Sequence, residues 1–224
     1  MAYRLIPAAD SQAGRKNRRF KKRDVSVKEE QILKTKSHEL LGKFLIDGLF
    51  VLPAPKHEKA FKMGCVGPDY NYLTYIKCSR KLQLFRGHNS INTKSFIRRT
   101  IGRLQKSRRW GMLHYYRLGK LIHYVSDSFT YAHNERFGNK ISEHRQYELK
   151  LQAFFSDYIL KQQSMLLRLG EQNLEETISL IHKQYLKTKA GILTDARYIF
   201  VAAGLVFNQL IPEARAGQAC RAAI

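Results

Sequence analysis

Apolar residues recur at helical spacing along most of the chain, and no β-type alternation lasts long enough to compete. The pattern starts after Ser26 and reaches Phe50, as one long helix or as two short ones that meet near Lys36. We expect further helices over residues 72–84, 93–106, 110–130, 142–168, 172–190 and 192–211. The sequence therefore predicts an all-α fold, a compact multi-helix bundle.

The stretch from Pro53 to Asn71 interrupts this pattern. It carries two prolines near its start, then Gly64, and then Gly67 and Pro68 directly before Asp69. Glycine and proline at this density are typical of loops. We therefore expect a loop here that ends in a tight Gly67-Pro68-Asp69 turn.

Positive charge dominates the chain and is concentrated near its start. Forty Lys and Arg stand against 18 Asp and Glu, a formal charge of +22, which favours polyanionic partners such as nucleic acid or an anionic membrane surface. We predict a basic, disordered extension over residues 1–33, a helical domain over 34–211 and a flexible tail over 212–224. The extension is either a tether to phosphate-bearing surfaces or a solvated tail.

Cysteine usage and hydropathy bear on location. The three cysteines form no CxxC pair, so neither a disulfide framework nor a thiolate zinc site is indicated. No secretory signal is recognised, and the longest apolar run, residues 198–207, suits a buried core helix better than a transmembrane one. We expect a cytoplasmic protein, in part peripheral to a membrane, and predict no protein partner.

Histidines and carboxylates recur at a spacing that suits a metal site. His123 and Asp127 are four residues apart within a predicted helix, and His144 and Glu148 repeat this spacing, with His133 between the pairs. Four residues advance about 400° around a helix, so each pair shares a face. One such pair is more often a surface hydrogen bond, but two pairs and a histidine indicate metal binding. Zinc accepts these donors, and paired zinc ions favour phosphodiester hydrolysis by a metal-bound hydroxide.

The order of these residues along the chain resembles the zinc-dependent phospholipase C family over residues 36–160. The resemblance also includes His38, the Gly67-Pro68-Asp69 turn and His88. That family is all-helical, is related in fold to single-strand-specific zinc nucleases, and holds three zinc ions in a cleft. The resemblance implies a general base at Asp69. It implies one zinc held by Asp69, His88, His123 and Asp127, a second held by His133, His144 and Glu148, and a third held by His38 with Asp127 bridging.

One feature of the family is missing. Secreted members complete the third site with an N-terminal tryptophan, whereas the single tryptophan here is Trp110. Either processing near Lys36 frees an amine, or backbone around Lys36 and Ser37 substitutes, or the third site is weak. We expect two firm Zn²⁺ sites and a less complete third.

Three functions fit these patterns. The first is a phospholipase C-like hydrolase acting on a phospholipid head group, with Tyr70 and Tyr72 as candidate walls of the substrate site. The second is a nuclease or another phosphoesterase using the same zinc site. The third is a catalytically weak, basic metal-binding protein tethered to polyanions. His57 and His182 have no acidic partner at ligand spacing, and His114, nine residues before His123, faces away from the metal ligands on the same helix, so none of the three is predicted to bind metal.

Overall fold

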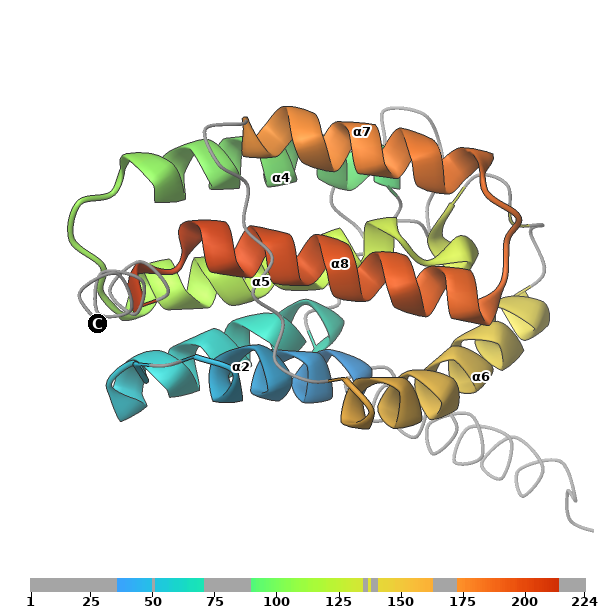
Figure 1. Cartoon of the computed structure of the whole chain (residues 1–224), viewed down its shortest axis with the longest axis horizontal. Coiled ribbons are helices and arrows are strands. Elements are labelled where there is room, and N and C mark those ends of the chain that lie inside the picture. The colour runs from blue at the N-terminus through green and yellow to red at the C-terminus, as the bar shows by residue number, and fades with distance from the viewer. Residues whose placement is uncertain are drawn as a thin grey trace, which may run out of the picture.

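The computed structural model of the chain describes residues 36–49, 51–70, 90–134, 137, 141–162 and 173–213. All regular structure within these ranges is helical (Figure 1). The helix over 36–47 precedes α2 (Pro55–Tyr70), α4 (Ser90–Lys106), α5 (Met112–Ser128), the 3-10 helix η1 (Tyr131–His133), α6 (Ile141–Leu160), α7 (Leu174–Lys187) and α8 (Ile192–Leu210). The all-α prediction is confirmed.

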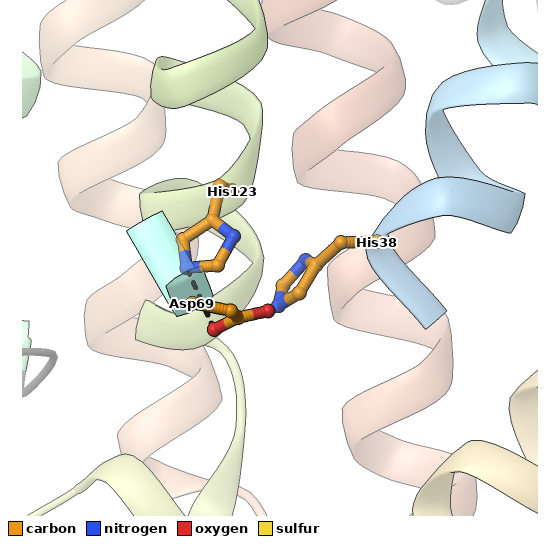
Figure 2. Close-up of side chains that lie close together, drawn as sticks. All are labelled: His38, Asp69 and His123. Atoms are coloured by element: carbon orange, nitrogen blue, oxygen red, sulfur yellow. Dashed lines mark ion pairs between the residues drawn. The ribbon is translucent and has the colours of Figure 1, made fainter. Parts of the chain in front are cut away.

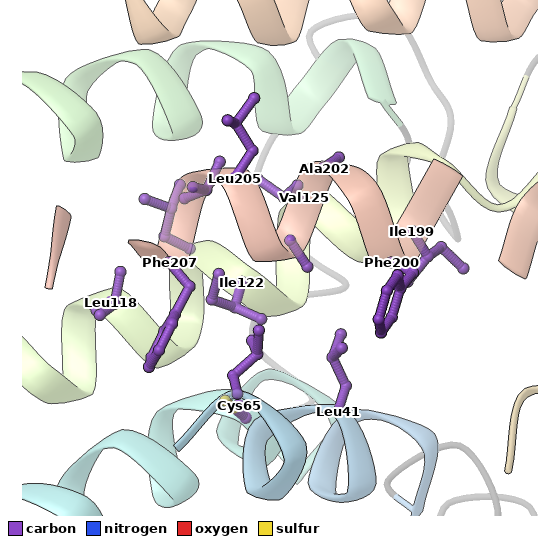
Figure 3. Packing of buried hydrophobic residues seen from close by; sticks show 14 of the residues in the cluster. Leu41, Cys65, Leu118, Ile122, Val125, Ile199, Phe200, Ala202, Leu205 and Phe207 are labelled. Carbon is purple, nitrogen blue, oxygen red and sulfur yellow. The ribbon is translucent and has the colours of Figure 1, made fainter. Parts of the chain in front are cut away.

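Helix α8 forms the centre of the bundle. It lies over α5, with α4 and α7 along one side, and α2 and the 36–47 helix along the other (Figure 1). Its apolar run is buried on nearly every side, from Ile199 to Leu210, because neighbours surround it. Phe200 and Phe207 point toward the layer that carries Leu41 and Cys65 (Figure 3). The prediction that residues 198–207 form a buried core helix is confirmed.

The loop predicted between Pro53 and Asn71 was wrong, since α2 runs from Pro55 to Tyr70. Pro55 is the first helical residue, where a missing N–H costs nothing. Gly64 serves helix packing instead of a turn: a Cβ there would lie 3.0 Å from the Gly119 Cα of α5 and would overlap the Tyr116 carbonyl oxygen. Pro68 occupies the last turn of α2. Glycine therefore marks the place where the backbones of α2 and α5 touch.

Several predicted helices can be compared directly with the observed bounds. The observed α4, α5, α7 and α8 begin and end within about three residues of the predicted ranges, the usual spread of such boundaries. Helix α6 ends at Leu160, earlier than predicted, because the amides of Lys161 and Gln162 bond three residues back and tighten the last turn. The predicted 72–84 helix, the extension over 1–33 and the tail beyond residue 213 lie outside the described residues. None of the described helices combines the length and apolar character needed to cross a membrane.

Candidate metal centre

His123 is the most constrained side chain of the site. It is fully buried on α5, and its Nδ1 lies 2.8 Å from the carbonyl oxygen of Cys65 on α2. A carbonyl can only accept a hydrogen bond, so Nδ1 carries the proton. This backbone contact fixes the tautomer and directs Nε2 toward the carboxylates, 3.2 Å from Asp127 Oδ2 and 3.6 Å from Asp69 Oδ1. Metal-ligating histidines are commonly oriented in this way.

Three segments bring a first group of ligand atoms together. His38 comes from the 36–47 helix, Asp69 from the last turn of α2, and His123 from α5 (Figure 2). One donor atom from each lies within 4.8 Å of the others. The rings of His38 and His123 pack at 4.0 Å between centroids, which places both imidazoles beside Asp69. These three residues are called group 1 below.

A second group lies where η1 meets α6. His133 ends η1, and its Nε2 is 3.2 Å from Glu148 Oε1. His144, one turn before Glu148 on α6, places Nδ1 3.3 Å from Oε2 of the same carboxylate. The donor atoms of His133, His144 and Glu148 also lie within 4.8 Å of one another. These residues are called group 2.

The carboxylate of Asp127 lies between the two groups. Its Oδ1 is 3.3 Å from His38 Nε2 and 3.9 Å from His133 Nε2, and its Oδ2 faces His123. A single buried carboxylate therefore reaches a histidine of each group, and shared carboxylates are typical of sites that hold paired metal ions.

The charges of this centre are strongly coupled. Burial alone would lower the pKa of His123, but Asp127 and Asp69 outweigh it and raise the pKa to about 9. Burial likewise opposes ionisation of Asp127, yet the neighbouring His123 and His133 hold the pKa of this carboxyl well below its usual range. The carboxylates of Asp69 and Asp127 therefore favour a positive charge beside them. In the absence of metal, a proton on His123 supplies it.

The structure brings together seven of the eight residues predicted as metal ligands. His38 lies with Asp69 and His123, and its Nε2 is also 3.3 Å from Oδ1 of Asp127, the residue that the resemblance gives as its bridging partner. His88 and Tyr72 lie outside the described residues, while Tyr70 is 56% exposed at the end of α2.

The histidines that were not predicted to bind metal belong to neither group. His114 Nε2 contacts Ser107 Oγ at 2.7 Å, His57 stacks on Tyr115, and His182 Nε2 lies 3.0 Å from the Ser128 carbonyl oxygen.

Asp195 holds the elements that carry group 2 in place, and this role was not predicted from the sequence. This fully buried carboxylate of α8 accepts hydrogen bonds from the Tyr131 amide at 2.7 Å, the Tyr147 hydroxyl at 2.8 Å and the Tyr185 hydroxyl at 2.9 Å. Tyr131 begins η1, and Tyr147 precedes Glu148, so Asp195 ties together the two elements that carry group 2. The sequence does place a single acidic residue in the first turn of an apolar helix, and a carboxylate buried there requires hydrogen-bond partners.

The family model for zinc-dependent phospholipase C matches residues 37–192, which include every residue of both groups. The chain belongs to the zinc-dependent phospholipase C family. No curated protein and no solved structure matches it. Family membership implies zinc, and the donors of both groups fit that metal, because they are imidazole nitrogens and carboxylate oxygens at ligand spacing with one histidine tautomer already fixed. Membership also supports a phospholipase C-like activity on phospholipid.

Proposed function

We propose that the chain hydrolyses the phosphodiester bond of a phospholipid head group at a zinc centre built from group 1, group 2 and Asp127. The position of Asp127 carries this proposal: its two oxygens face His38 and His123 of group 1, and Oδ1 also faces His133 of group 2. Two adjacent cation sites suit a phosphodiester, because both the attacking and the leaving oxygens need stabilisation.

The residues of the centre have different roles in the proposed reaction. Zinc held in these groups supplies Lewis acidity toward a phosphoryl oxygen and lowers the pKa of a coordinated water. The Cys65 carbonyl keeps His123 Nε2 directed inward. Asp69, buried beside His123, accepts the proton of the attacking water on its carboxylate, as the predicted general base. Asp127 sets the spacing of the two groups.

The test compares zinc content with diacylglycerol release from mixed micelles of phosphatidylcholine. Asp127→Asn should remove zinc and activity together, because it neutralises the carboxylate that both groups share. Asp69→Asn keeps an oxygen donor but weakens the base, so we expect zinc to remain while the rate falls by roughly 10²–10⁴-fold. Loss of zinc in Asp69→Asn would contradict its role as a base and leave it only as a ligand.

Matched controls separate the site from general effects on charge. Asp47→Asn changes an exposed acid on the helix that carries His38, and His114→Gln changes a histidine outside both groups. Both should keep zinc and activity. A protein that holds zinc but releases no diacylglycerol under any of these conditions would refute the lipase proposal.

A second candidate is hydrolysis of a nucleic-acid phosphodiester, favoured by the net charge of +22. It predicts cleavage of single-stranded DNA by the zinc-loaded protein and a loss of this cleavage in Asp127→Asn. Comparing the two substrates at equal ionic strength decides between them, because electrostatic attraction to nucleic acid weakens steeply with salt.

A further inference from the structure

A cavity of about 540 Å³ lies between α4, α5 and α7, across α5 from the metal centre. Val125 of α5 and Phe129, which caps the C-terminus of α5, line it, each two residues beyond His123 or Asp127 in sequence. Two residues advance about 200° around a helix, so these side chains leave α5 on the face opposite the metal ligands. No residue of group 1 or group 2 lines the cavity. It is therefore separate from the centre described above.

The interior of the cavity is apolar. Val125 and Phe129 are fully buried and Ile101 is 1% exposed, so these side chains form the floor beneath the cavity. His182 and Ser128, joined by a hydrogen bond between the histidine ring and the serine carbonyl oxygen, contribute polar atoms at the wall. The aliphatic lining is completed by Ile97, Ile178 and Leu186. This interior suits an alkyl chain, and its volume lies within the range of ordinary ligand pockets.

The charged residues that line the cavity are mostly positive. Lys94 and Arg98 come from α4 and Lys183 from α7, against Glu175, which pairs with Arg98 at 3.0 Å. The four groups sum to a formal charge of +2. An uncharged lipid would gain nothing from this rim, and a cationic one would be repelled. A polyanion such as nucleic acid would leave the apolar interior unfilled.

We propose that this cavity binds a single-chain anionic amphiphile, with its alkyl chain along Ile97, Ile178 and Leu186 and its head group between Lys94 and Lys183. The ligand is a fatty-acid-like molecule, distinct from the phosphodiester substrate of the metal centre. The site needs no zinc, so it stands or fails independently of the proposed hydrolysis.

Calorimetric titration of the full chain with straight-chain carboxylates tests the site. Each added methylene from octanoate to dodecanoate should tighten binding about fourfold until the cavity is full. Dodecyl phosphate shares the anionic chemistry, so binding of either compound supports the site, and the tighter one identifies the head group. Dodecyltrimethylammonium should bind far more weakly. Equal binding of this cation, or affinity that does not depend on chain length, would overturn the proposal.

Variants locate the binding. The double change Lys94→Gln with Lys183→Gln should weaken dodecanoate binding about tenfold or more. The matched control, Lys106→Gln with Lys187→Gln, removes the same charge from the same two helices at residues that do not line the cavity, and should bind as the unchanged protein does.

The interior is probed by Ser179→Trp, which places a ring in the cavity from α7 and should abolish binding. Helix content measured by circular dichroism reports on folding in every variant, since the described fold is all-helical. If Ser179→Trp does not fold, the paired lysine variants still decide: equal binding by both double variants refutes the site.

Discussion

The close contact between α2 and α5 makes Gly119 a sensitive position. Substitution by alanine would place a Cβ 2.7 Å from the Cys65 amide nitrogen and 2.9 Å from the Gly64 carbonyl carbon, and closer still to the Phe61 carbonyl oxygen. Ordinary contact begins at about 3.4 Å. All three neighbours are backbone atoms, so no side chain can rotate away. Helix α2 must move away from α5.

The cost can be estimated from two opposing effects. Overpacking typically destabilises by about 1–3 kcal/mol, and the rigid backbone contacts place Gly119→Ala at or above the upper end. Alanine regains up to about 1 kcal/mol through its higher helix propensity. We expect a net loss of about 2 kcal/mol, or a fall in Tm of roughly 4–8 °C for a chain of this size.

The same displacement should reach group 1. Asp69 lies on α2, and His123, whose Nδ1 binds the Cys65 carbonyl of α2, lies on α5. Separating the helices therefore disturbs both the ligand spacing and the histidine orientation. Group 2 lies on η1 and α6, away from this contact, and should keep its zinc.

Denaturant unfolding and zinc analysis measure these two effects, and Gly102→Ala is the control. Gly102 lies inside α4, and a Cβ there would meet nothing within 4 Å. This variant should gain about 0.5–1 kcal/mol and keep all its zinc. Equal stability and zinc content in Gly119→Ala and the unchanged protein would refute the argument.

Three further predictions concern the buried polar groups. In the metal-free protein, the pKa of His123 is raised from about 6.5 in the unfolded chain to about 9 in the fold. Protonated His123 therefore stabilises the fold, by roughly 3 kcal/mol at most, at pH values below about 6.5. This contribution is lost as the pH rises through about 9. Urea unfolding at pH 6.5 and pH 9 should show this loss without zinc and not with zinc. Asp195→Asn should weaken zinc binding at group 2 by up to roughly tenfold and change the visible spectrum of the cobalt-substituted protein, whereas Asp157→Asn, an exposed acid on α6, should not. Burial raises the pKa of the Cys65 thiol, so peptide mapping should find it alkylated by iodoacetamide only after unfolding.

The helices were predictable because their periodicity is local. Helix α8 could be placed, and its burial inferred, from the apolar run alone. The error over α2 has a physical cause. Gly64 and Gly67 look the same in sequence whether they serve a turn or a helix contact, and only the partner helix, with Tyr116 and Gly119, distinguishes the two.

The candidate site, too, could be predicted only where its contacts are local in sequence. The pairs His123 with Asp127 and His144 with Glu148 follow from helical geometry, and both pairs lie at contact distance. The grouping of His38 with Asp69 could not be read from spacing, because it depends on how two helices pack against α5. The support from Asp195 was equally hidden, since its donors are 10 to 64 residues away in sequence.

The central position of α8 also bears on how the protein is made. This helix follows every candidate ligand along the chain, yet α5, α6 and α7 all pack against it. While the ribosome releases the chain at about 5–20 residues per second, the faces of these helices that α8 covers in the folded protein remain open until α8 follows. The nascent protein therefore passes through a stage in which every candidate ligand is already synthesised, but Asp195 of α8, which binds Tyr131 and Tyr147 beside group 2, is not.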